Sequence, residues 1–154
     1  MKVAIGQDSH RFDFENTNKK LILGGVLFEG YAGLNGNSDA DVVLHAITNA
    51  VSGITCKNII GKVADDMCKS GITDSEEYLK EALKYLDDSI EHLSISIECK
   101  TPKITPMIEK MRENIAGILN IRPNQIGITA TTGEGLTEFG KGEGISVFCV
   151  LTVD

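Results

Sequence analysis

Several short segments of this chain alternate between apolar and polar residues, which is the pattern of half-buried β-strands. The clearest segment runs from Leu93 to Cys99, where every second residue is apolar and the residues between are serine or glutamate. A strand of this type places its apolar side chains on one face of a sheet. The same reasoning predicts strands at residues 3–11, 126–131 and 145–153, and one or two short strands at 21–28, interrupted by two glycines.

Other segments repeat apolar residues every three or four positions, as an amphipathic helix does. Three helices are predicted in this way: from a cap at Ser38 or Asp39 to about Ile54, from about residues 74–75 onward, and from about 105 to 120. Helices thus alternate with strands along a chain of 154 residues. We therefore expect a single domain, 1–154, with a layered α+β fold (an α/β sandwich) in which helices cover a mixed sheet.

The charge of the chain excludes some function classes. Its 22 acidic residues outnumber 15 lysines and arginines, which gives a formal net charge of -7. Nucleic-acid binding and polybasic membrane attachment both require basic surfaces, so we expect no nucleic-acid partner and no membrane partner. No apolar run is long enough to predict a membrane span, and the N-terminus does not resemble a signal peptide. The four cysteines lack C-x-x-C spacing, so we expect a cytoplasmic protein with reduced, mostly buried thiols.

Acidic and histidine residues near the N-terminus are candidate metal ligands. Asp8 and His10 share one face of a predicted strand, and Asp41 and His45 lie one turn apart on a predicted helix. Asp8, His10 and His45 can bind Zn²⁺ and leave a fourth position open, as catalytic zinc sites do. Asp41 is then expected to orient the His45 ring. The alternative is a polar strand end and a solvated helix face; with only three histidines in the chain, we favour the metal site, and expect His92 at the surface.

A second group of residues suits phosphate binding. Glycines and threonines gather at 130–135 and 140–144, and such turns offer backbone N–H groups and hydroxyls to phosphate oxygens. Glu134 is a candidate Mg²⁺ ligand because Mg²⁺ often binds one carboxylate together with substrate phosphates. Lys103 is a candidate phosphate contact, although an exposed loop lysine explains it equally well.

The ordered set of motifs resembles the 2-C-methyl-D-erythritol 2,4-cyclodiphosphate synthase family of the non-mevalonate isoprenoid pathway. The similarity covers nearly the whole chain. It rests on Gly6-Gln7-Asp8-Ser9-His10, Leu23-Gly24-Gly25-Val26, Ser38-Asp39-Ala40-Asp41, Leu44-His45-Ala46, Pro102-Lys103, Ala130-Thr131-Thr132-Gly133-Glu134 and Gly140-Lys141-Gly142-Glu143-Gly144.

The resemblance implies a chorismate-mutase-like homotrimer with an active site at each subunit interface. It implies Zn²⁺ on Asp8, His10 and His45, and Mg²⁺ or Mn²⁺ on Glu134 and the substrate diphosphate. The implied reaction converts 4-diphosphocytidyl-2-C-methyl-D-erythritol 2-phosphate to the cyclic diphosphate with release of CMP. The implied catalytic residues are Asp8, His10, His45, Glu134 and Thr132.

The resemblance also implies contacts to the substrate. The CDP part would be held from the neighbouring chain by Cys99, Lys103, Ala130, Thr131 and Thr132, whereas Ser38 would lie near the methylerythritol phosphate. Lys141 is a further candidate contact, and together with Gln7 and a shifted Phe139 it falls where the family shapes its trimer axis.

The sequence departs from the family on the sugar side of the site. Asn37 replaces a usual histidine, Asn58 replaces an aspartate that holds substrate hydroxyls, and either Asp65 or Asp66 matches a further family acid. These changes keep two alternatives open: a divergent metal-dependent enzyme acting on another nucleotide diphosphate, and a non-catalytic metal- or nucleotide-binding trimer.

Overall fold

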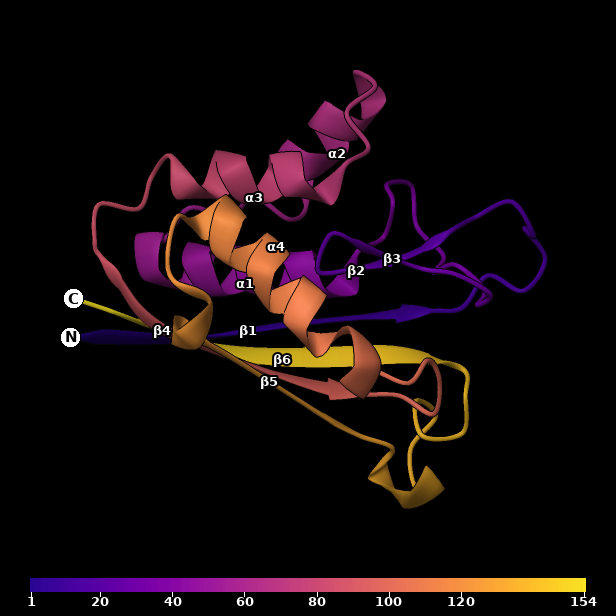
Figure 1. Ribbon diagram of the computed structural model, residues 1–154. Coiled ribbons are helices and arrows are strands. Elements are labelled where there is room, and N and C mark those ends of the chain that lie inside the picture. Colours follow the sequence, from indigo (N-terminus) through magenta and orange to yellow (C-terminus); the bar gives the residue numbers. More distant parts are fainter.

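The computed structural model describes residues 1–154, with helices packed on one face of a β-sheet (Figure 1). The sheet is mixed: β4 and β5 are parallel, and the other neighbouring pairs are antiparallel. Its strand order is β1 (Lys2–Arg11), β6 (Gly144–Val153), β4 (Ile90–Glu98) and β5 (Ile126–Thr131). The α+β class and the mixed sheet expected from the sequence are therefore confirmed.

The helical layer and a separate hairpin complete the fold. The hairpin pairs β2 (Leu21–Leu23) with β3 (Val26–Phe28). The α-helices are α1 (Val42–Thr55), α2 (Lys62–Lys69), α3 (Ser75–Leu83) and α4 (Ile108–Leu119), and short 3₁₀ turns are η1 (Thr105–Met107), η2 (Pro123–Gln125) and η3 (Gly133–Gly135). None of these helices has the length and apolar character that crossing a membrane requires.

Alternation along the strands separates a covered face from an open face. In β6 the odd-numbered residues from Ile145 to Val153 are buried beneath the helices. The opposite face carries apolar side chains that remain exposed: Val3, Ile5, Phe148 and Val150. Ile5 pairs directly with Val150 in the ladder between β1 and β6, so these side chains form one surface.

Gly6 brings α1 into direct contact with β1. A Cβ atom at this position would lie 1.9 Å from the carbonyl oxygen of Ala46, so any side chain here would push the helix away. Helix α1 contains His45, and β1 contains Asp8 and His10. The absence of a side chain at Gly6 therefore allows groups far apart in the sequence to meet.

Three local features differ from the sequence predictions. Helix α1 starts at Val42 with Asp41 as its cap, rather than at Ser38 or Asp39, because Ala40 has a left-handed backbone with φ of 57°. Helix α2 was not predicted, because it spans only eight residues and its apolar side is short: Ala64 is buried, and Met67 and Cys68 are only partly buried against the core. The third predicted helix begins as the turn η1 before α4 continues it.

Candidate metal centre

Asp8, His10 and His45 meet at the contact between β1 and α1. Asp8 Oδ2 lies 2.9 Å from His10 Nε2 and 3.0 Å from His45 Nδ1, and the two nitrogens are 3.4 Å apart. These three atoms are the only cluster of acidic, histidine or cysteine ligands in the chain close enough to share one ion. In a tetrahedral zinc site with bonds of about 2.0–2.1 Å, ligand atoms lie about 3.3–3.4 Å apart. The observed triangle is close to that size.

The donor set of this triangle fits a divalent cation. One carboxylate and two imidazoles are the ligand types of catalytic zinc sites, and three ligands leave a fourth position for a substrate oxygen. His45 is buried, whereas Asp8 and His10 are partly exposed, so solvent reaches the triad from one side. The triad can therefore hold a metal and still admit a ligand.

His10 is oriented by a backbone group. Its Nδ1 lies 2.9 Å from the carbonyl oxygen of Asn35, which can only accept a hydrogen bond. Nδ1 must therefore carry the proton, and in the neutral ring the lone pair of Nε2 points toward Asp8. Such a backbone contact to the second ring nitrogen is typical of metal-binding histidines.

Protons and metal compete for the triad. Burial works to raise the pKa of Asp8, but hydrogen bonds with His10 and His45 outweigh it and lower the pKa to about 2. Burial works to lower the pKa of His10, and its hydrogen bond with Asp8 outweighs this and raises the pKa. Asp8 is therefore an anion at neutral pH, and it attracts positive charge into the centre.

The prediction that Asp41 orients the His45 ring is wrong. Asp41 is fully buried, and its carboxylate accepts backbone hydrogen bonds from Leu44, Gly24 and Gly25. Burial raises the pKa of Asp41 to about 6, against the opposing effect of these N–H donors. The Nε2 atom of His45 instead lies 2.8 Å from Ser75 Oγ, at the start of α3.

The loop beside His10 carries Asn37 and Ser38, two of the expected sugar-side contacts. The Lys19 ammonium group donates to the carbonyl oxygens of Gly36 and Ser38 at 2.8 and 2.7 Å. The carbonyl oxygen of Asn37 accepts from Cys68 Sγ, which belongs to α2. Lys19 was not predicted, because it acts on a loop 17–19 residues further along the chain.

The remaining sugar-side candidates lie on or just before α2. Asn58 is exposed ahead of this helix, and Asp65 and Asp66 are exposed in it. Asp66 pairs with Lys62 at 2.8 Å, whereas Asp65 has no ion-pair partner. The Cys68–Asn37 contact links α2 to the loop beside His10, so these acids border the triad side of the molecule without contacting the triad.

The predicted nucleotide contacts line a cavity that is separate from the triad. A volume of about 370 Å³ is lined by residues of the segment after β4 and of the end of β5 and the turn that follows it, among them Cys99, Lys103, Ala130, Thr131 and Thr132. Lys103 forms no ion pair, so its ammonium group is free to bind an anion. The hydroxyls of Thr131 and Thr132 accept backbone bonds from Gly133 and Glu134, which leaves their hydrogens for a phosphate oxygen.

The triad and this cavity lie at the same end of the sheet but on opposite edges. Strand β1 forms one edge and β5 the other, and three strand spacings separate them by roughly 14 Å. Glu134, in the turn after β5, is therefore not among the residues that meet at the triad. Lys141 lies in the loop before β6 and pairs with Glu138 at 3.4 Å. Within one copy of the chain, the triad and the cavity around the predicted nucleotide contacts are thus two separate candidate half-sites.

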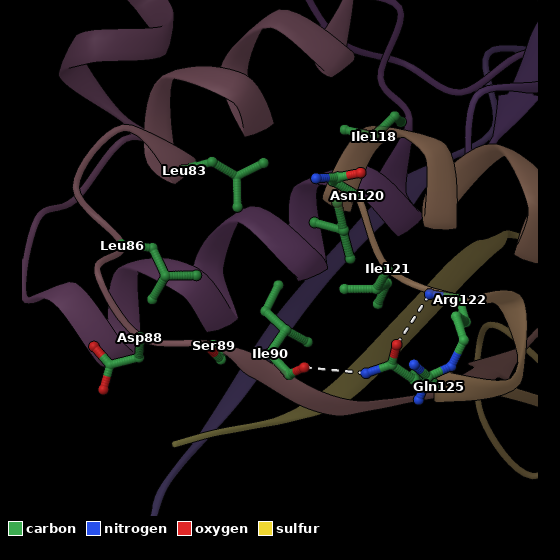
Figure 2. Close-up of a pocket in the computed structure, with 11 residues that line it drawn as sticks. Leu83, Leu86, Asp88, Ser89, Ile90, Ile118, Asn120, Ile121, Arg122 and Gln125 are labelled. Carbon is green, nitrogen blue, oxygen red and sulfur yellow. Dashed lines mark hydrogen bonds between the residues drawn. The ribbon is translucent and has the colours of Figure 1, made fainter.

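A larger cavity is not part of either candidate half-site. A cavity of about 720 Å³ lies between the C-terminal ends of α3 and α4 and the start of β4, with Leu83, Leu86 and Ile118 around it (Figure 2). Gln125 at its edge already donates to the carbonyl oxygen of Ile90. Ile90 pairs with Val153, at the opposite end of the sheet from His10. This cavity contains none of the predicted site residues.

The cysteines and His92 follow the sequence expectations in part. All four cysteines are free thiols, but only Cys99 and Cys149 are buried. Burial raises the pKa of Cys99 to about 11, so its thiol is neutral at physiological pH. His92 is exposed, as expected, on the open face of β4.

Comparison with known proteins adds independent information. The model of the YgbB family matches residues 1–154. The chain is 52% identical to the 2-C-methyl-D-erythritol 2,4-cyclodiphosphate synthase of Chlamydia caviae, over 99% of this chain and 88% of that protein. A solved 2C-methyl-D-erythritol-2,4-cyclodiphosphate synthase has a TM-score of 0.87 at 26% identity, covering 99% of this chain and 100% of that chain. The bifunctional IspDF of Campylobacter jejuni has a TM-score of 0.85 at 29% identity, covering 97% of this chain and 41% of that chain.

Proposed function

Since the chain belongs to the YgbB family and matches its cyclodiphosphate synthases along nearly its whole length, we propose that it forms 2-C-methyl-D-erythritol 2,4-cyclodiphosphate. The substrate is 4-diphosphocytidyl-2-C-methyl-D-erythritol 2-phosphate. An oxygen of the 2-phosphate attacks the β-phosphorus, the bond from that phosphorus to the oxygen bridging to the α-phosphate breaks, and CMP leaves with that oxygen. The observation that carries the proposal is the triad of Asp8, His10 and His45 with its open coordination position.

The charges of the reacting groups explain why such a centre is needed. The nucleophile and the electrophile are both phosphates, so each must be neutralised and held in line. Zn²⁺ on the triad supplies Lewis-acid polarisation of a phosphate oxygen. Asp8 and the two histidines fix where that polarisation acts. Glu134 is proposed as the ligand of Mg²⁺ or Mn²⁺ on the diphosphate, since its carboxylate is exposed in the turn after β5.

The separation of the two half-sites supports an assembly of several copies, which is proposed to be a trimer. The roughly 14 Å across the sheet is too wide for one chain's triad and nucleotide cavity to share one diphosphate. We place the cytidine of each substrate in the cavity of a neighbouring copy, where Lys103, Thr131 and Ala130 bind it and Thr132 faces the diphosphate. The exposed apolar face around Ile5 and Val150 is the surface proposed to pack between copies.

The methylerythritol part is proposed to lie between the triad and α2. Ser38 and Asn37 are on the loop that His10 and Lys19 hold, and Asn58 and Asp65 or Asp66 approach from the α2 side. Asn58 can donate and accept hydrogen bonds with sugar hydroxyls without adding charge. Asn37 retains hydrogen-bonding capacity beside the phosphate in the same way.

Phosphorus NMR tests this function directly. The protein is incubated with the authentic substrate, Zn²⁺ and Mg²⁺, and the signals of a cyclic diphosphate and CMP are expected to appear together. Chelation and His45→Ala are each expected to abolish both signals. Linear phosphate products would show hydrolysis instead of cyclisation, and unchanged substrate would exclude the reaction.

A further inference from the structure

The second nitrogen of His45 faces a buried hydroxyl that is itself held by a carboxylate. Ser75 is fully buried, and its Oγ lies 2.8 Å from His45 Nε2. The same Oγ donates a hydrogen bond to Asp39 Oδ1. Asp39 is anchored in turn, because its carboxylate accepts the backbone N–H groups of Ser75 and Asp41, each at 3.1 Å. The side chains of His45, Ser75 and Asp39 are therefore connected by a continuous series of hydrogen bonds.

The carboxylate decides the direction of these hydrogen bonds. An ionised carboxylate can only accept, and a bond to it is stronger than a bond to a neutral nitrogen. The single hydroxyl hydrogen of Ser75 is therefore given to Asp39. Ser75 Oγ can then only accept from His45, so Nε2 must carry the ring proton and Nδ1 must carry the lone pair.

A competing arrangement makes this selection necessary. His45 Nδ1 lies 3.0 Å from Asp8 Oδ2, so a neutral ring could instead donate its proton from Nδ1 to Asp8. In that tautomer the lone pair would sit on Nε2, pointing away from the metal position. We propose that Asp39 and Ser75 are positioning residues that select the metal-binding tautomer of His45 and thereby set the metal affinity of the triad. This inference rests on the metal binding proposed above, but not on the reaction.

The most selective test is the variant Asp39→Asn, which keeps the size of the side chain. An amide in this position can donate to Ser75 Oγ, which frees the Ser75 hydroxyl to donate to His45 Nε2 and so favours the wrong tautomer. Ser75→Ala removes the acceptor altogether. Each change is expected to weaken Zn²⁺ binding by about 10- to 100-fold, the range observed when partners of metal-binding residues are removed. The affinity is measured by competition with a chelator.

Asp74→Ala is the matched control. Asp74 caps α3 directly before Ser75 and accepts a hydrogen bond from Glu76 N, but its side chain forms no hydrogen bond with His45 or Asp39. This variant weakens the start of α3 without changing the hydrogen bonds of the ring. Its Zn²⁺ affinity is expected to stay within about twofold of the wild type, on the basis that only partners of the metal ligands tune the metal. An equal loss in Asp74→Ala would overturn the positioning role.

The tautomer can also be measured in the metal-free wild type. Two-bond ¹H–¹⁵N correlation spectra distinguish a protonated ring nitrogen from one with a lone pair, and His10→Ala and His92→Gln assign the signals by elimination. The spectra are recorded at a pH where the ring is neutral. His45 is then expected to carry its proton on Nε2 in the wild type and on Nδ1 in Asp39→Asn. A wild-type ring protonated on Nδ1 overturns the proposal even if both variants fail to fold.

The outcomes separate this inference from the proposed function. Wild-type Zn²⁺ affinity in both Asp39→Asn and Ser75→Ala refutes the positioning role and leaves the metal site intact. Failure of the wild type to bind Zn²⁺ refutes the metal site itself, and the tautomer spectra still decide which nitrogen Ser75 and Asp39 protonate.

Discussion

Asp8 is the residue on which both histidines of the candidate metal centre converge. Its lowered pKa means that the native state binds its proton less tightly than the unfolded chain, where the value is about 3.8. The resulting stabilisation is complete above the unfolded value and is lost as the pH falls through about 2. Asp8 therefore makes the stability of the metal-free protein depend on pH, with a loss of stability in acid.

This linkage predicts a pH-dependent difference between the wild type and Asp8→Asn. With metal removed, the wild type is expected to be more stable above about pH 4, and its advantage to shrink as the pH approaches 2. The measurement is urea unfolding of both proteins across this range. An advantage that stays constant with pH would contradict the lowered pKa of Asp8.

At the scale of elements, Asp41 joins the β2–β3 turn to the start of α1. One oxygen caps the helix through Leu44 N and also binds Gly24 N, while the other binds Gly25 N. Gly25 has a left-handed backbone with φ of 75°, which turns its N–H toward this carboxylate. The helix that carries His45 is thereby fixed relative to the hairpin.

Removing this connection is expected to destabilise the fold. Asp41→Ala leaves the helix cap and the turn N–H groups without their acceptor, at a cost of about 2–4 kcal/mol in the free energy of unfolding. Asp74→Ala removes an exposed cap with a single N–H partner and should cost only about 0.5–1 kcal/mol. Denaturant unfolding compares the two. Equal losses would show that Asp41 acts as an ordinary cap.

Most of the regular elements, with the exception of α2, and the residues of the candidate metal triad could be predicted from the sequence because each depends on local spacing. Alternation places Asp8 and His10 on one face of β1, and the scarcity of histidine points to His45. The partner of His45 could not be predicted in this way. Ser75 is 30 residues away, and only the packing of α3 against α1 brings it to the ring. Asp41, the nearest carboxylate along the helix, was chosen wrongly because its position as the helix cap turns it toward backbone N–H groups.

At the scale of the whole molecule, the open face of the sheet predicts assembly. Ile5 and Phe148 are 67% and 48% exposed. Contact between such a continuous apolar surface and water is unfavourable, and surfaces of this kind often mark protein interfaces. Ile5→Glu places a charge on this face, opposite Val150 of β6, and is expected to dissociate the protein. Light scattering should then report the monomer mass of 16.6 kDa in place of about three times that value. Lys110→Glu, at an exposed position of α4, is the charge-change control and should leave the mass unchanged.

The proposed division of the site between copies predicts complementation. His45→Ala removes the triad half, and Lys103→Ala removes the nucleotide half, so each variant alone is expected to be inactive or strongly impaired. In mixed trimers, an intact triad of one variant faces an intact cavity of the other, and activity should reappear. The measurement is CMP release after co-expression. If mixed trimers have no activity, the triad and the nucleotide cavity of one chain must act on the same substrate, which would contradict the shared site.

The antiparallel pairing of β1 with β6 also fixes where the chain ends lie. The amino group of Met1 is 3.3 Å from the carboxylate of Asp154, and both termini lie side by side in Figure 1. His10 is eight residues further along β1 than Lys2, which at about 3.3 Å per residue places the metal centre roughly 26 Å away. A purification tag or a second enzyme domain joined at either end therefore extends away from the metal centre and leaves its entrance free.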